Sequence, residues 1–113
     1  MFGHEKFEAY QLSIKFLKLA LTLHDRLPQG SAGVKDQLKR AALSIPLNIA
    51  EGSGKISKPD RNRFYGIARG SAMECAALCD VIALLDKRYC SETREGKKLL
   101  LSVVRILSAV CLR

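Results

Sequence analysis

Four polar residues lie at matching spacing in two stretches that are otherwise apolar. Asn48 and Glu51 are three residues apart, and Ser71 and Glu74 repeat this spacing further along the chain. Residues three apart share one face of a helix, so antiparallel neighbouring helices could bring all four together. The spacing predicts a structural polar network of Asn48, Glu51, Ser71 and Glu74. Further donors must satisfy its carboxylates, because a lone buried carboxylate is costly.

The alternative for these two glutamates is general acid–base catalysis, and the sequence offers little to support it. No nucleophile or histidine accompanies Glu51 or Glu74, so we expect no catalytic residues and no enzyme. Bundles that hold two metal ions use Glu-x-x-His pairs, and His4 and His24 lie outside that spacing. We therefore expect no metal and no cofactor.

Two of the four cysteines, Cys75 and Cys79, are four residues apart and would share a helix face. No further Cys or His near them completes a tetrahedral metal site, so core packing is the better interpretation. The N-terminal residues do not resemble a signal peptide, and Leu99–Leu112 is too short and too polar to span a membrane. These features favour a cytoplasmic protein whose cysteines stay reduced.

Positive charge is concentrated in the middle of the chain. The whole sequence carries 19 Lys and Arg against 11 Asp and Glu, a net charge of +8, and residues 35–69 alone carry +5. A concentrated positive field favours a nucleic-acid partner, although it can also serve solubility alone. The residues that we expect to contact nucleic acid are Lys55, Lys58, Arg61, Arg63 and Arg69.

Two aromatic residues are interleaved with these charges. Tyr65 could stack on a base if it is exposed. The alternative is that Phe64 belongs to the core and that the charges are merely solvated. The sequence leaves both possibilities open.

Apolar residues recur at helical spacing along almost the whole chain, and no strand pattern competes. The expected helices span about residues 5–27, 34–52, 59–88 and 92–112. Short connections between them predict an all-α, up-and-down (antiparallel) four-helix bundle, with residues 1–113 as one domain. The first and fourth helices each carry two apolar stripes, which predicts self-association through the surplus surface.

Particular residues should shape these helices. Pro46 lacks an N–H and should kink the second helix, while Gly52 and Gly54 should end it in a left-handed conformation. Gly66 and Gly70 suggest close approach of another helix. Further expectations are that Ser57 or Asp60 caps the third helix, that Ser91 caps the fourth, that Phe64 and Leu85 belong to the core stripe of the third helix, and that Lys35, Lys39 and Arg40 face water.

Two strings in this sequence carry a family resemblance. Ser44-Ile-Pro-Leu-Asn-Ile-Ala-Glu-Gly52, together with Ala68-Arg-Gly-Ser71 and Glu74, closely resembles a four-helix-bundle family. Its members are encoded in intervening sequences of bacterial large-subunit ribosomal RNA genes. The family also includes the accessory variability determinant of diversity-generating retroelements.

The resemblance implies a ring-like homopentamer of four-helix bundles. For the retroelement branch it also implies a basic ring that binds RNA or DNA and a reverse transcriptase. We therefore expect a non-enzymatic, self-assembling protein that binds nucleic acid, of the intervening-sequence or the retroelement-accessory type. The alternative is a protein–protein interaction scaffold that binds no nucleic acid.

Overall fold

Four long α-helices account for most of the chain. The computed structural model describes residues 1–113, with α1 at Glu8–Arg26, α2 at Ala32–Ser53, α3 at Lys58–Leu85 and α4 at Cys90–Cys111. Single 3₁₀ turns precede three of them: η1 at Gly3–Lys6, η2 at Gln29–Ser31 and η3 at Lys87–Tyr89. The bounds differ by at most three residues from those predicted.

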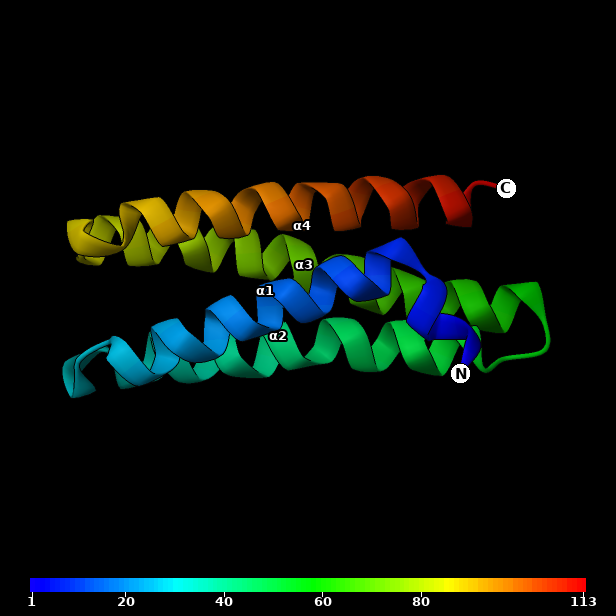
Figure 1. Ribbon diagram of the computed structural model, residues 1–113, viewed down its shortest axis with the longest axis horizontal. Helices are drawn as coiled ribbons and strands as arrows, with labels where there is room; N and C mark the ends of the chain where they lie inside the picture. Colours follow the sequence, from blue (N-terminus) through cyan, green and yellow to red (C-terminus); the bar gives the residue numbers. More distant parts are fainter.

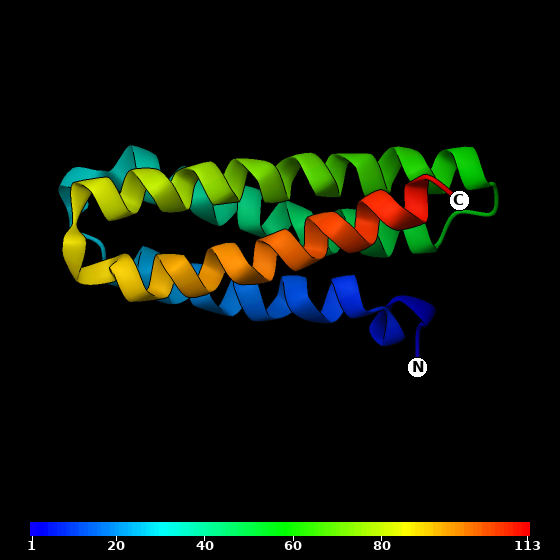
Figure 2. The ribbon, with the colours of Figure 1, turned by 90° about the horizontal axis from the view of Figure 1, so that it is seen from above.

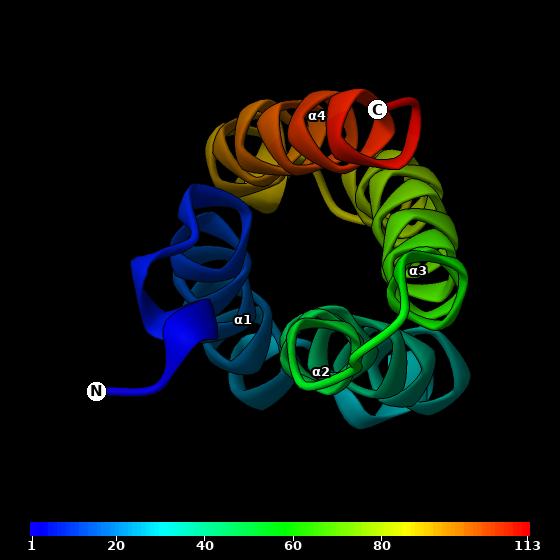
Figure 3. The same cartoon turned by 90° about the vertical axis from the view of Figure 1, so that its right-hand side faces the viewer.

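The helices form an antiparallel bundle. Because the chain reverses direction at every connection, both termini lie at one end (Figures 1 and 2). Each helix packs against the helices before and after it in the chain, and α1 closes the bundle against α4 (Figure 3). The bundle measures 44 × 22 × 20 Å. The predicted up-and-down four-helix bundle is therefore confirmed, and no helix is both long enough and apolar enough to cross a membrane.

The core is built from one inward stripe of each helix. In α2 the predicted stripe is confirmed, since Leu38, Ile45 and Ile49 are fully buried. In α3 the predicted stripe is wrong in two places. Tyr65 is buried in place of Phe64, which is only half-buried, and Leu85 is 59% exposed. The buried face of α3 is therefore shifted by one residue from the predicted face. Because both neighbouring residues are aromatic, the sequence did not distinguish them.

The start of α3 confirms its predicted cap, whereas the start of α4 does not. Ser57 Oγ accepts a hydrogen bond from the Asp60 N–H at 3.3 Å, and a proline occupies the first turn. By contrast, η3 runs directly into α4, so Ser91 lies inside the first turn of that helix. The capping side chain is instead that of Asp86, which immediately precedes η3 and accepts a hydrogen bond from the backbone N–H of Arg88.

The end of α2 corrects the expected role of its glycines. No glycine has a positive φ, and Gly54 ends the helix in an ordinary right-handed conformation. Gly52 is buried within the helix, and a Cβ there would lie 2.7 Å from Cδ1 of Tyr65. Gly52 thus permits close packing of α3. The helix runs unbroken through the buried Pro46, and a bend at that point stays a prediction.

Other close approaches also differ from expectation. Gly66 and Gly70 have open space where a Cβ would be, so they make no tight contact within the chain. Gly96 of α4 does, because its Cβ would meet Phe16 and Leu19 at 3.0 Å. The sequence carried no separate signal for Gly96.

Lys35 is the one basic residue of α2 that does not face water. Lys39 and Arg40 are exposed as expected, but Lys35 is only 8% exposed. Its Nζ donates a hydrogen bond to the Leu27 carbonyl at 3.3 Å, which satisfies the charge at the α1–α2 connection.

Candidate nucleic-acid interface

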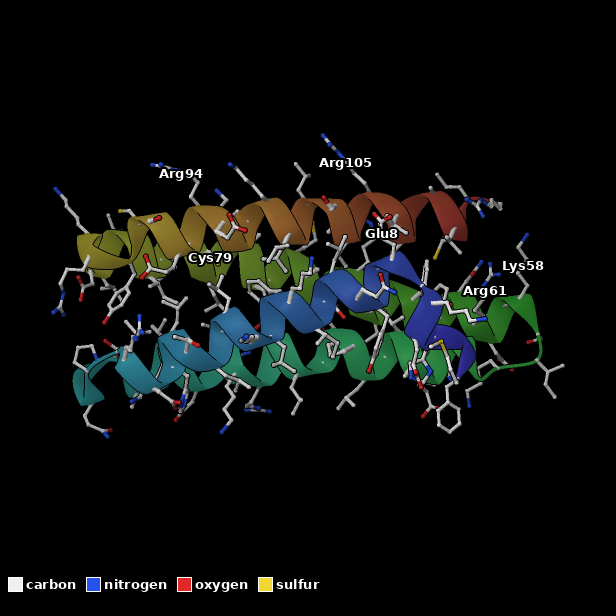
Figure 4. The ribbon with its side chains drawn as sticks, in the orientation of Figure 1. Glu8, Lys58, Arg61, Cys79, Arg94 and Arg105 are labelled. Carbon is white, nitrogen blue, oxygen red and sulfur yellow. The ribbon has the colours of Figure 1, made fainter.

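The five predicted nucleic-acid-binding residues lie around the α2–α3 connection and the first half of α3. Lys55 is in the connection, Lys58, Arg61 and Arg63 are in the first turns of α3, and Arg69 follows about two turns later. Lys58 and Arg61 are at the end of the bundle where the C-terminus also lies (Figure 4). In the structure, these five residues contact different partners.

Lys58 and Arg61 reach toward the C-terminal end of α4. Arg61 Nη2 donates to the Val110 carbonyl at 3.4 Å, and Lys58 Nζ donates to the Arg113 carbonyl. The neighbouring Asn62 amide donates to the Cys111 carbonyl at 3.3 Å. The last carbonyls of a helix lack partners within the helix and carry partial negative charge, so cations stabilise them. These two charges therefore help to join α3 to α4.

Arg69 makes a second connection between the same helices. Its Nε donates a hydrogen bond to Ser108 Oγ of α4 at 2.7 Å. The side chain remains exposed, so its charge still contributes to the surface.

Lys55 and Arg63 flank one aromatic ring. Lys55 Nζ lies 5.1 Å from the centroid of the Phe64 ring, and the Arg63 guanidinium lies 4.6 Å from it. Both distances are within the range of a cation–π interaction. Lys55 also pairs with Glu51 at 3.5 Å, whereas Arg63 forms no ion pair in the chain. We call Lys55, Arg63 and Phe64 the aromatic–basic cluster.

Tyr65 is unavailable for base stacking. It is 5% exposed, its hydroxyl lies 2.8 Å from Ser53 Oγ, and its ring packs 5.6 Å from that of Phe7. The condition for stacking by Tyr65, that it be exposed, is not met. Phe64 takes its place as the accessible aromatic residue.

The predicted polar network is wrong in its two glutamates. Asn48 Nδ2 donates to the Ser44 carbonyl at 2.8 Å and to Ser44 Oγ at 2.9 Å, and Ser44 Oγ lies 2.9 Å from Ser71 Oγ. Glu51 and Glu74 are exposed and outside this chain of contacts. Their carboxylates point toward water, which avoids the desolvation that a buried network would impose.

The partners of the glutamates confirm their surface position. Glu51 pairs with Lys55, and Glu74 accepts a hydrogen bond from the Gln37 side-chain amide. The sequence analysis missed Ser44, although it precedes Asn48 by one helical turn and so shares its face.

The remaining titratable groups form no metal centre. No three His, Cys, Asp or Glu side chains gather closely enough to hold a metal ion. Burial, with smaller effects from nearby charges, raises the pKa of Cys75 to about 12 and that of Cys79 to about 11. Both are fully buried thiols, as the core-packing interpretation predicted.

Comparison with known proteins agrees with this architecture. The model of the family described as 23S rRNA-intervening sequence protein matches residues 5–109. The chain belongs to this family. The match runs from before α1 nearly to the end of α4, and it confirms the resemblance found in two strings of the sequence. No curated protein sequence matches the chain.

In this intervening-sequence protein, the two signature strings lie on facing helices. Ser44–Gly52 belongs to α2 and Ala68–Ser71 to α3, and Ser44 and Ser71 are in contact. Gly52, at the end of the first string, receives the Tyr65 ring of α3. Both strings therefore contribute to the α2–α3 interface.

Proposed function

We propose that this protein is a non-enzymatic, self-assembling bundle that binds RNA or DNA in the cytoplasm. In this proposal it acts as an intervening-sequence protein or as a retroelement accessory protein, the latter with a reverse transcriptase as a further partner. The observation that carries the nucleic-acid proposal is the aromatic–basic cluster of Lys55, Arg63 and Phe64. It combines two cations with a half-buried aromatic ring at the basic end of the bundle where α2 joins α3.

The chemistry of this cluster suits a single strand or a loop. Cationic side chains contact phosphates, and the release of counterions makes such binding salt-dependent. A phenylalanine ring can stack on a base of any sequence, since every base has an aromatic face. Lys58, Arg61 and Arg69 add positive potential, but Arg61 and Arg69 also have partners on α4, and Lys58 has one at Arg113, just beyond α4.

Fluorescence anisotropy with labelled single-stranded and duplex RNA and DNA, at graded salt, tests this proposal. Lys55→Gln with Arg63→Gln should reduce the salt slope by about one to two, because roughly two phosphate contacts are lost. The matched control is Lys39→Gln with Arg40→Gln, which removes two exposed charges from α2 and should change the slope less. The proposal fails if no probe binds at low salt, or if the two double variants behave alike.

Self-assembly is supported by the outward face of α3. Gly66, Gly70, Met73, Ala77, Val81 and Leu84 follow one another at spacings of three and four, and all are exposed. This row contains no charged residue over more than four turns, and Leu84 is 84% exposed. A long uncharged face with two glycines allows another helix to approach closely. We propose that it is the surface on which copies associate, with the homopentamer of the family as the expected assembly.

A second candidate function is a protein–protein interaction scaffold. The same exposed apolar row on α3 favours it, since such patches mark interaction sites. In this case, a partner would be captured at high salt and after nuclease treatment. Loss of capture under those conditions would instead support nucleic-acid binding.

A further inference from the structure

A surface groove runs between α3 and α4, away from the aromatic–basic cluster. Its floor is apolar, six of its nine lining residues are hydrophobic, and its volume is about 360 Å³. The lining residues from α3 are small or flexible: Ala72, Ala76 and Met73. The apolar lining residues from α4 are larger: Leu100, Leu101 and Val104. The groove exists because α3 presents two alanines opposite the leucines of α4.

Polar connections between the helices lie at both ends of this groove. Lys97 Nζ donates to Asp80 Oδ1 at 2.7 Å at one end, and Arg69 donates to Ser108 at the other. Lys97 and Ser108 are separated by about 16 Å along the helix axis. The apolar surface between them is therefore a bounded slot rather than an open helix face.

Three cations of α4 surround one end of the slot. Arg94, Lys97 and Lys98 all contribute to its lining. Asp80 neutralises Lys97, but Arg94 and Lys98 form no ion pair in the chain. Arg94 extends outward from α4 in Figure 4. No acidic residue lines the groove.

We propose that this groove binds a small anionic amphiphile, namely a carboxylate with a single aliphatic chain. The carboxylate would lie at Arg94 and Lys98, and the chain would lie over Ala72, Leu101 and Val104. Charge complementarity selects the anionic head, and the apolar floor selects the aliphatic tail. A volume near 360 Å³ is within the range of small-molecule sites, about 300–1,000 Å³.

The apolar floor distinguishes this groove from a nucleic-acid site. Phosphate backbones need cations and polar donors along their path, and here the cations are confined to one end. Met73 and Leu101 at the mouth are 53% and 50% exposed, so a bound chain would remove apolar surface from water. The proposal is independent of nucleic-acid binding at the aromatic–basic cluster, and the groove shares only Met73 with the proposed association row of α3.

Isothermal titration calorimetry with dodecanoate, below its micellar concentration, tests the proposal on the full chain. Octanoate, decanoate and dodecanoate should bind progressively more tightly, by about fourfold for each added CH₂. Dodecyltrimethylammonium has the same chain and the opposite charge, and it should bind at least fivefold more weakly. Equal binding of the two head groups, or no binding of dodecanoate, overturns the proposal.

Variants locate the site. Ala76→Phe fills the groove and should abolish binding, whereas Ala109→Phe, exposed on α4 outside the groove, should leave it unchanged. Arg94→Gln with Lys98→Gln should weaken binding about two- to fivefold, as expected for exposed ion pairs. Should Ala76→Phe fail to fold by circular dichroism, Leu101→Gln replaces it. Because Leu101 is half-exposed, this variant should fold and lose affinity by about fivefold.

A second copy of the chain is the competing occupant of the groove. In that case Leu101→Gln would lower the mass measured by light scattering, and dodecanoate would not bind the assembled protein. That result would overturn the proposal. An unchanged mass together with weakened dodecanoate binding would support it.

Discussion

Gly52 lies where the Tyr65 ring packs against α2. A Cβ at this position would be 2.7 and 2.8 Å from two ring carbons and 3.0 Å from the Arg61 carbonyl oxygen. The ring cannot easily move aside, because it is buried and its hydroxyl contacts Ser53. Gly52 is thus needed for its missing side chain and not for a left-handed conformation.

Gly52→Ala should therefore destabilise the fold by about 1–3 kcal/mol, the usual effect of overpacking, despite the better helix propensity of alanine. Urea denaturation followed by circular dichroism measures this change. Gly33→Ala is the matched control, since it is also in α2 but has open space around it. Equal stabilities for the two variants would show that the Tyr65 contact does not constrain position 52.

The buried thiols of Cys75 and Cys79 make stability depend on pH in alkali. Their ordinary pKa is 9.0, and burial raises these values to about 12 and about 11. Above pH 9.0 the unfolded chain therefore loses these protons while the folded chain keeps them. Stability should be unaffected by the two thiols below this pH and should fall above it.

The expected fall is at most about 1.4 kcal/mol per pH unit for each thiol, up to the folded pKa. Urea denaturation at about pH 8 and about pH 10, with reductant present, measures it. Other groups also titrate in this range, so the control is Cys75→Ala with Cys79→Ala. This double variant should show a shallower fall than the wild type. Parallel pH profiles would contradict the assignment.

At the scale of the helices, α2 and α3 are held in register by more than apolar packing. The Asn48–Ser44–Ser71 contacts place one polar connection in the middle of the interface. Because Ser44 and Ser71 are half-buried, their hydroxyls can satisfy each other where water has limited access.

A double-mutant cycle of Ser44→Ala and Ser71→Ala should give a coupling energy of about 0.5–1.5 kcal/mol, the net contribution of a typical hydrogen bond. This coupling energy is measured by chemical denaturation of the wild type, both single variants and the double variant. Ser102→Ala paired with Ser44→Ala serves as a non-contacting control, since Ser102 is on α4. A coupling energy near zero for Ser44 and Ser71 would mean that the contact adds nothing to stability.

At the scale of the whole molecule, the apolar surface is not distributed as the two stripes of α1 and α4 suggested. Five of the fourteen exposed large apolar side chains belong to α3: Ile67, Met73, Val81, Leu84 and Leu85. In α1 only Ile14 and Leu21 are exposed, because its other large apolar residues pack on or into the core. The proposed association surface is therefore on α3.

Val81→Glu should weaken self-association, because it places a charge on this uncharged row. Val81 is already 40% exposed, so the isolated chain should still fold. Multi-angle light scattering should show a shift toward the mass of one chain, 12.5 kDa. The control is Thr22→Glu, which makes the same change of charge at an exposed position of α1 and should leave the mass unchanged. A wild-type protein that is monomeric at micromolar concentration would contradict self-assembly.

Much of the fold could be predicted because helical periodicity is a local property. The spacing of Leu38, Ile45 and Ile49 determines which face of α2 is apolar, whatever its neighbours are. Ser57 caps α3 through contacts within one turn, so its role was also visible in the sequence. The strings in α2 and α3 were enough to indicate the family.

The candidate site was less predictable, because it depends on which side of each helix meets a neighbour. Phe64 and Tyr65 are both aromatic and equally suited to a core, and only the rotation of α3 against α2 buries Tyr65 and leaves Phe64 half-buried. Likewise, Lys58 and Arg61 are ordinary surface cations in the sequence. They became partners of the Val110 and Arg113 carbonyls because the end of α4, about 50 residues away in the chain, lies beside the start of α3.

The sequence by itself thus determined the helices, the inward face of α2 and the family of this protein, since each depends on contacts within a few turns. The tertiary structure decided what the polar and basic residues contact. It removed Glu51 and Glu74 from the polar network, divided the five basic residues between the C-terminal part of the chain and the Phe64 ring, and created the groove over Ala72 and Ala76. These outcomes depend on long-range packing, which one-dimensional periodicity does not contain.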